Sequence, residues 1–329
     1  MLARKLKWML LARLLGSAAV AALLADFGGP LWAALSVLIF VLADAPFLAL
    51  AYALARKNGS PPPGELRPDA AQSFAAGLRE WANFFVLFTI LQPFESFFMG
   101  EDACFDSCTR ATPVLLAHGY CCNRAIWWWI RGRLRARGLV VATVNFEPIF
   151  GDIDAFAEQL DARINSVLAE TGASRLTLAT HSMGGLVARA YLRLYGDAKV
   201  AALVTLAAPH HGSLLARLGI GRHARQMEPD SAWLRELDAT KITIPVVAVW
   251  SVSDEFVAPQ DSARWPGARE LVLAGHDHMS MVFSDRVASI IGDAAVEAAA
   301  LEMQPFQQLG EGDLIRARHV GALGALGGG

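Results

Sequence analysis

Leu176-Thr177-Leu178-Ala179-Thr180-His181-Ser182-Met183-Gly184-Gly185-Leu186 is the stretch that decides the fold. Its first five residues are apolar or β-branched and have the length of a buried strand, and a helical pattern follows the two glycines. A serine at such a junction stands on a sharp turn with its hydroxyl exposed. It needs small residues two positions before and after it, because strand and helix backbones pass closely there. Gly184 meets this need, Thr180 stands where glycine is usual, and we expect Ser182 to be a nucleophile.

Five further short apolar runs flank this stretch and alternate with helical patterns. The six predicted strands are Val114–Ala117, Leu139–Val144, Leu176–Thr180, Val200–Leu206, Pro245–Trp250 and Glu270–Leu273. Strands that are apolar on both faces and separated by helices predict an α/β fold, with about six mostly parallel strands and helices on both faces. Active sites of such sheets lie at the carboxyl ends of the strands, so candidate residues are sought there.

A serine hydroxyl is weakly nucleophilic until a base removes its proton, so the site also needs a histidine and an acid. The loop after the fifth run offers Asp254, with Glu255 as the alternative, and the loop after the sixth offers His276 and His278. We favour His278, since it leads directly into the next apolar helix. The two histidines have no third ligand at a typical spacing, so the sequence indicates no metal site.

The tetrahedral intermediate of acyl transfer needs hydrogen-bond donors for its developing negative charge. The backbone N–H of Met183 is one candidate, because it lies at the helix start directly after the expected nucleophile. The second is the backbone N–H of Tyr120, in the loop after the first strand, where Gly119 allows a close approach. His118 is interpreted as a structural residue that forms hydrogen bonds.

The composition predicts that part of the chain lies in a membrane. Of the 329 residues 54% are hydrophobic and 18% charged, against about 45–50% and about 25% in ordinary soluble domains. A net charge of −2 gives no reason to expect nucleic acid, and four cysteines are too few for a disulfide scaffold. Whether any of Cys104, Cys108, Cys121 and Cys122 pair depends on which side of the membrane they occupy.

The apolar excess lies at the N-terminus. A basic start precedes a charge-free run from Leu14 to Ala25, and a second run extends from Leu31 to Ala55, interrupted by Asp44 and Pro46. We expect a transmembrane helical hairpin with both ends in the cytoplasm. A cleaved signal peptide and a buried soluble helix pair are the alternatives.

A third aromatic-rich stretch, Trp81–Met99, contains Gln92, Pro93 and Glu95. A carboxylate inside a spanning helix is unfavourable by about 2.5 kcal/mol or more. We therefore expect this stretch to lie at the membrane surface or under the catalytic domain. If it spans the membrane instead, the catalytic domain moves to the opposite side.

The motifs His118-Gly119-Tyr120, Thr180 to Gly185 and Ala208 to Ser213, together with Asp254 and His278, resemble the lipase/esterase branch of the α/β-hydrolase superfamily. The similarity covers roughly Pro113 to Ile291 and is greatest to bacterial membrane-anchored serine esterases. The resemblance implies Ser182, Asp254 and His278 as the catalytic triad and Tyr120 and Met183 as oxyanion donors. It implies no cofactor, and it implies a lid or acyl-binding insertion at about 213–240, which could alternatively only pack over the sheet.

The expected organisation follows from these segments. It comprises a transmembrane hairpin (1–57), a linker (58–72), an aromatic-rich interfacial segment (73–110), an α/β-hydrolase catalytic domain (111–302) and a flexible tail (303–329).

The expected function is a serine carboxylic-ester hydrolase that cleaves apolar acyl esters through an acyl-enzyme. It would be anchored in a membrane, by expectation the bacterial inner membrane, and would act on a small-molecule ester or lipid. An acyltransferase or thioesterase using the same triad is the alternative. A membrane-anchored, non-catalytic hydrolase-like binding protein is a further one.

Overall fold

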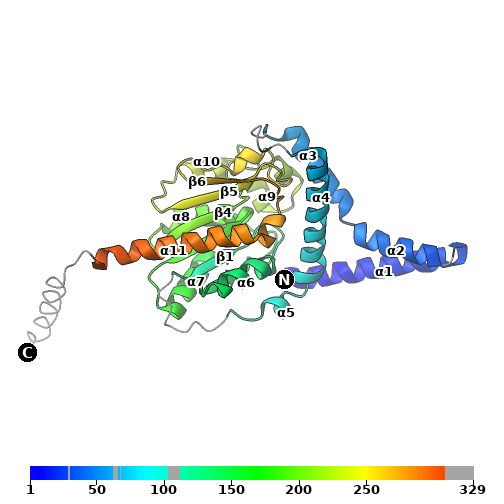
Figure 1. The fold of residues 1–329 in the computed structure, drawn as a ribbon, viewed down its shortest axis with the longest axis horizontal. Coiled ribbons are helices and arrows are strands. Elements are labelled where there is room, and N and C mark those ends of the chain that lie inside the picture. Colours follow the sequence, from blue (N-terminus) through cyan, green and yellow to red (C-terminus); the bar gives the residue numbers. More distant parts are fainter. Residues whose placement is uncertain (29, 62–65, 67, 103–111, 308–329) are drawn as a thin grey trace, which may run out of the picture.

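A computed structural model describes residues 1–28, 30–61, 66, 68–102 and 112–307 (Figure 1). The expectations for Cys104 and Cys108, for linker positions 62–65 and 67 and for the tail beyond residue 307 lie outside these residues.

The core is a six-stranded sheet with strand order β2-β1-β3-β4-β5-β6, in which every neighbouring pair is parallel. Its strands are β1 (Val114–Ala117), β2 (Val141–Val144), β3 (Leu176–His181), β4 (Val200–Leu206), β5 (Val246–Ser251) and β6 (Arg269–Leu273). Each coincides with a predicted strand to within two residues at either end. The parallel α/β sheet predicted from the alternating apolar runs is therefore confirmed.

Helices cover both faces of the sheet (Figure 1). Neighbouring strand residues point to opposite faces, so Leu115 packs in the core under α7 (Ile153–Thr171) and α8 (Met183–Tyr195). Leu116 packs in the core under α6 (Trp128–Ala136) and α11 (Asp285–Gln307). Both leucines are fully buried, which explains why these strands show apolar runs rather than alternation.

Short helices follow the ends of several strands and build the loops around the site. They are η3 (Arg124–Trp127), η4 (Leu214–Leu218), α9 (Arg222–Gln226), α10 (Ala232–Asp238), η5 (Gln260–Ala263) and η6 (Ser280–Phe283). The expected insertion at 213–240 thus contains η4, α9 and α10. Leu234 and Leu237 of α10 are buried in the same core as α7 and α8, so part of the insertion packs against the domain.

Two N-terminal helices, α1 (Leu2–Gly28) and α2 (Pro30–Leu42), lie side by side and project away from the sheet (Figure 1). Large apolar side chains on them are exposed, among them Trp8, Leu15 and Leu38. The guanidinium of Arg13 donates to the Asp44 carboxylate at 2.9 Å. This pair compensates the acid within the apolar run.

The second apolar run is not one continuous helix. It divides into α2 and α3 (Ala45–Asn58), with a turn at residues 43–44 and Pro46 in the first turn of α3. Proline lacks the N–H that a helix interior requires, which explains the break. Three helical segments are still long and apolar enough to cross a membrane by length and composition: Leu2–Leu23, Ala34–Asn58 and Ala70–Leu91.

The third of these segments packs against the catalytic domain. It consists of α4 (Ala70–Phe85) and the π-helical η2 (Val86–Leu91), and the short helix α5 (Glu95–Met99) follows. Phe84, Leu87 and Leu91 are buried in the same core as α6 and α11. In the described residues this aromatic stretch therefore packs against one face of the α/β domain, which is one of the two locations expected for it.

Candidate active site

Ser182 stands at a strained turn between β3 and α8. Its backbone has φ 55° and ψ −128°, a region that residues other than glycine rarely adopt. A Cβ at Gly184 would lie 2.7 Å from the carbonyl oxygens of Ala117 and His118. Since only glycine permits this close passage, the turn has the strand–serine–helix geometry expected of a nucleophile elbow.

Thr180 fits this turn although glycine is usual there. Its hydroxyl donates to the carbonyl oxygen of Val204 in the neighbouring strand at 3.3 Å, so its buried polar group has a partner. A Cβ at Gly185 would lie 3.5 Å from that hydroxyl oxygen, an ordinary contact distance. The larger side chain at position 180 is therefore accommodated beside a glycine.

Asp254 and His278 form a buried pair on the loops after β5 and β6. Nδ1 of His278 lies 2.9 and 3.0 Å from the two carboxylate oxygens of Asp254, and both residues are nearly inaccessible to solvent. The backbone N–H groups of Phe256 and Val257 also donate to Asp254, which fixes its orientation. A carboxylate accepts only, so the network assigns the proton to Nδ1 and leaves Nε2 free to accept one.

His181, directly before Ser182, links the elbow to the loop that carries His278. Its Nε2 lies 3.1 Å from the carbonyl oxygen of His278, and the two ring centroids are 4.6 Å apart. Burial lowers the pKa of His181 well below its usual value. A neutral His181 can donate from Nε2 to that carbonyl, and so it holds the backbone of His278 beside the end of β3.

The loop after β1 packs directly on Ser182. A Cβ at Gly119 would lie 2.8 Å from Cβ of Ser182, so only glycine allows this approach. The adjoining Tyr120 hydroxyl donates to the carbonyl oxygen of Ile220 at 3.0 Å and accepts from its N–H at 2.8 Å. Tyr120 thus connects the expected oxyanion loop to the insertion, while Met183 begins α8 on the other side of Ser182.

His118 forms only structural hydrogen bonds. The backbone N–H of Phe146 donates to its Nε2 at 3.1 Å, and its Nδ1 lies 2.9 Å from the carbonyl oxygen of Gly119. Burial lowers its pKa to about 4, so the ring stays neutral near pH 7. Because both ring nitrogens are occupied, His118 is not available as a base.

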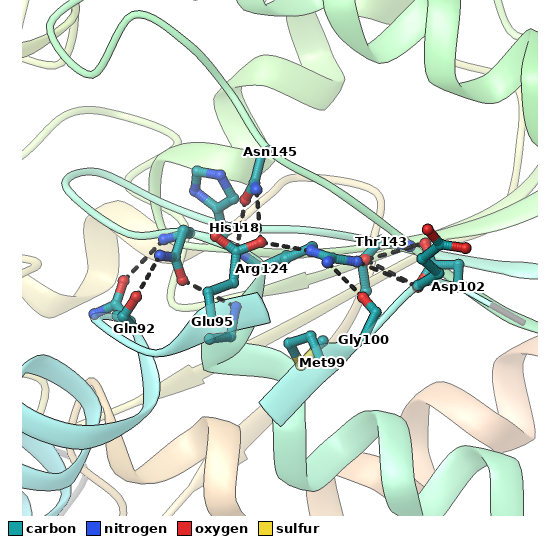
Figure 2. Close-up of polar contacts among 12 residues, drawn as sticks. Gln92, Glu95, Met99, Gly100, Asp102, His118, Arg124, Thr143 and Asn145 are labelled. Carbon is teal, nitrogen blue, oxygen red and sulfur yellow. Dashed lines mark hydrogen bonds and ion pairs between the residues drawn. The ribbon is translucent and has the colours of Figure 1, made fainter. Parts of the chain in front are cut away.

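Polar contacts stabilise the position of Arg124, which follows the Tyr120 loop in the sequence (Figure 2). The Arg124 side chain donates from Nε to the Glu95 carboxylate at 2.6 Å and from Nη2 to the Gly100 carbonyl at 2.6 Å. The Glu95 carboxylate also accepts from the amide of Asn145 at 2.9 Å. Segment 92–102, which precedes the catalytic core in the sequence, is thereby attached to the loops after β1 and β2.

Two further acids, Glu255 and Asp277, are buried beside the Asp254–His278 pair. Oε2 of Glu255 accepts from the backbone N–H of His278 at 3.1 Å. Burial raises the pKa of Glu255 well above its usual value, and the nearby carboxylates add to this effect. Glu255, the alternative acid, therefore contacts the backbone of His278, and Asp254 contacts its ring.

Asp277 gives a pH-dependent prediction for stability. Burial raises its pKa from 3.8 to about 6, although the Arg79 guanidinium lies 3.5 Å away. The folded state thus binds this proton more tightly than the unfolded state. The wild-type protein therefore loses stability as the pH rises from the ordinary pKa of 3.8 through the folded-state pKa of about 6. Asp277→Asn should therefore raise the free energy of unfolding at pH 8 by about 3 kcal/mol at most, and by only about 0.5 kcal/mol at pH 4. Thermal unfolding of both proteins at the two pH values measures this, and an equal difference at both would contradict it.

The other residues that the sequence offered, His276 and the cysteines, do not contact the Asp254–His278 pair through a hydrogen bond in the described residues. The half-exposed His276 contacts the Ala274 carbonyl through Nδ1 at 3.1 Å and the Ser284 hydroxyl through Nε2 at 2.9 Å. Cys121 and Cys122 are free thiols. Within the described part of the chain, no group of three or more His, Cys, Asp or Glu side chains is placed to hold a metal ion.

Sequence reasoning missed two residues near the site, His181 and Glu80. His181 gave a detectable signal, since a histidine beside the expected nucleophile at the end of a buried strand must find a partner. The signal for Glu80 was a lone acid in an apolar helical stretch. Its partners lie about 200 positions further along the chain, so the pattern alone could not identify them.

Comparison with known proteins agrees with this architecture. Residues 154–284 match the family model described as PGAP1-like alpha/beta domain. The chain is 34% identical over 112 residues to a triacylglycerol lipase of Pseudarthrobacter phenanthrenivorans, covering 32% of this chain and 35% of that protein. A triacylglycerol lipase of Burkholderia plantarii is also 34% identical over 112 residues, covering 32% and 31%. The chain thus spans about a third of the length of these curated relatives.

Among solved structures, a lipase of Bacillus licheniformis in its mature form superposes with a TM-score of 0.52 at 17% identity, covering 59% of this chain and 96% of that one. At this identity the likeness concerns the fold. The region from β1 to α11 therefore has the α/β-hydrolase fold, and part of it is similar in sequence to triacylglycerol lipases.

Proposed function

We propose that this protein is a membrane-anchored serine carboxylic-ester hydrolase that acts on apolar acyl esters. The observation that carries the proposal is the buried Asp254–His278 pair, which His181 holds beside the strained Ser182 turn. The similarity to triacylglycerol lipases supports an ester or lipid substrate.

The proposed acylation step uses these residues. His278 accepts the Ser182 hydroxyl proton on Nε2 as the serine oxygen attacks the ester carbonyl carbon. Asp254 accepts the Nδ1–H hydrogen bond, keeps the ring in the correct tautomer and stabilises the imidazolium that forms. The backbone N–H groups of Met183 and Tyr120 donate to the developing oxyanion, and each such donor is typically worth about 2.7–4 kcal/mol.

Collapse of the tetrahedral intermediate breaks the bond to the leaving alcohol, which takes the proton from His278. A water molecule then gives a proton to the neutral His278 and attacks the acyl-enzyme carbonyl. The second intermediate releases the carboxylic acid and restores the Ser182 hydroxyl. The cycle needs no cofactor, because the proton moves only among Ser182, His278, alcohol and water.

The insertion offers an apolar surface for the acyl chain. Leu218 and Ile220 are each 65% exposed, and Ile220 is tied through its backbone to the Tyr120 hydroxyl next to the expected oxyanion loop. An acyl chain that extends from the reacting carbonyl towards the insertion would cover these two side chains.

A chain-length comparison tests this substrate class. The double variant Leu218→Ser/Ile220→Ser should lower kcat/KM for a p-nitrophenyl C12 ester by about 10-fold, because apolar contact with the long chain is lost. The C4 ester should change less than about twofold, because a short chain does not reach the insertion. Leu194→Ser, which alters an exposed leucine of α8, serves as the control. Equal losses for both esters would contradict the role of the insertion.

The N-terminal helices provide the proposed anchor. Segments Leu2–Leu23 and Ala34–Asn58 are long and apolar enough to span a membrane, and less than a fifth of each is buried within the protein. The lipase/esterase domain would then act on substrate at the membrane surface. Membranes of a bacterium expressing the chain should keep it through an alkaline carbonate wash. Release into the supernatant would show that the helices only associate with the surface.

A further inference from the structure

Helix α4, which precedes the hydrolase core in the sequence, reaches the backbone of the loop that carries His278. The Glu80 side chain is fully buried, and its two carboxylate oxygens accept from consecutive backbone N–H groups, Met279 at 2.5 Å and Ser280 at 2.8 Å. These are the first two amides after His278. A buried backbone N–H that loses its acceptor destabilises the fold, so this double contact stabilises the position of the loop.

The neighbouring residue on α4 holds the other end of the same loop. The Arg79 guanidinium donates from Nη2 to the carbonyl oxygen of Gly275, and its charge lies 3.5 Å from the Asp277 carboxylate. Two adjacent residues of one helix thus contact positions 275–280 on both sides of His278.

A second carboxyl group connects Glu80 to His278 itself. Glu255 accepts from the N–H of His278 through Oε2, and its buried carboxyl lies near enough to Glu80 for the two groups to interact electrostatically. Burial raises the pKa of Glu255 well above its usual value, and the neighbouring Glu80 carboxyl adds to this effect. The two carboxyl groups together contact three consecutive backbone amides, Glu255 that of His278 and Glu80 those of Met279 and Ser280.

We propose that Glu80 is a positioning residue for His278. Helix α4 would then not only connect the N-terminal helices to the domain but also fix the loop that carries His278. This inference rests on the proposed hydrolase function. Without the Glu80 carboxylate, the amides of Met279 and Ser280 lose their buried acceptors, and the loop shifts to find others. A displacement of His278 by about 1 Å from Ser182 and Asp254 is enough to lower the rate by about 10²-fold.

The test compares Glu80→Gln and Glu80→Ala with Leu78→Ala, an exposed position on the same helix. Glu80→Gln keeps the size of the side chain but replaces one acceptor oxygen by an amide donor. We expect kcat for a p-nitrophenyl ester to fall by about 10²-fold in both Glu80 variants, with KM within about threefold of wild type. Leu78→Ala should retain wild-type kcat.

A merely structural role predicts a different result. The endpoint of fluorophosphonate labelling counts the sites that can react, and the labelling rate reports how well His278 activates Ser182 at each site. Positioning predicts a slow rate at a nearly full endpoint. A reduced endpoint with a wild-type rate per site, or a wild-type kcat in Glu80→Gln, overturns the proposal.

A spectroscopic readout separates this inference from the proposed function. The His278 Nδ1–H proton, bonded to Asp254, should give a downfield resonance in the wild-type protein that is shifted or lost in Glu80→Gln. If no ester is cleaved but this resonance responds to the substitution, the hydrolase function fails and the coupling of Glu80 to His278 stands. An unchanged resonance overturns the coupling whatever the activity.

Discussion

Ser182→Ala is expected to lower kcat for a p-nitrophenyl ester by about 10⁴-fold or more and to abolish labelling by a fluorophosphonate. Alanine has no hydroxyl to attack the carbonyl carbon, so what remains is the modest catalysis that the oxyanion donors and substrate binding give alone. The assay needs detergent-solubilised full-length protein, since the N-terminal helices expose large apolar side chains. Ser289→Ala, on the exposed side of α11, is the matched control.

The loss should arise without unfolding. Ser182 occupies the position before the first turn of α8, but its side chain makes no capping hydrogen bond, so removing the hydroxyl sacrifices no structural contact there. The melting temperature of Ser182→Ala should therefore stay close to that of wild type. Hydrolysis and labelling that continue at the wild-type rate would remove Ser182 as nucleophile and with it the acyl-enzyme mechanism.

The elements of the catalytic domain could be predicted because their causes are local. A run such as Val200–Leu206 is apolar throughout because helices cover both sides of the strand, and that cause is visible in seven consecutive residues. The turn at Ser182 is likewise recognisable from consecutive residues, because the serine is followed by two glycines at positions 184 and 185. Their need for glycine comes from distant contacts, since a Cβ at Gly184 would meet backbone oxygens of Ala117 and His118 and one at Gly185 would meet the Cβ of Ala208. Placing Asp254 and His278 together needed one further rule, that the carboxyl ends of parallel strands meet at one edge.

Features that depend on distant contacts could not be predicted in this way. Glu80 lies in an apolar helix, and its proposed role depends on hydrogen bonds from two backbone amides that are 199 and 200 positions away. The expected interfacial segment that contains it (73–110) has the composition of a membrane-surface segment. Its burial against α6 and α11 becomes evident only when the sheet and its helices are assembled. Hydropathy alone cannot separate these two apolar environments.

The burial of acidic side chains is another feature that the sequence does not predict. Glu255 and Asp277 stand beside the expected catalytic residues in the sequence, where acids are commonly solvated. The structure buries both, at a cost in stability that their raised pKa values express. Proteins retain such unfavourable groups mainly at functional sites. Their burial here is consistent with a loop held in place for His278 rather than optimised for stability.

The two histidines of that loop provide the sharpest comparison. His278→Ala should lower kcat by about 10⁴-fold or more, because removal of the base leaves the Ser182 hydroxyl weakly nucleophilic. His276→Ala should stay within about threefold of wild type, since among the described residues that ring hydrogen-bonds to the Ala274 carbonyl and the Ser284 hydroxyl and not to a carboxylate. Both kcat values are measured with the same C4 and C12 esters, and the melting temperature of each variant is measured alongside.

The comparison of His278→Ala with His276→Ala is informative because the two residues lie two positions apart in one loop. A substitution that merely disturbed the loop would affect both variants alike, whereas a specific proton transfer affects His278 alone. The distinction has a structural basis, since Nδ1 of His278 faces Asp254 at 2.9 Å while Nδ1 of His276 faces a backbone carbonyl. A carbonyl cannot stabilise an imidazolium as a buried carboxylate does. If His276→Ala inactivates the protein and His278→Ala does not, the base is misassigned and the Asp254–His278 pair is only structural.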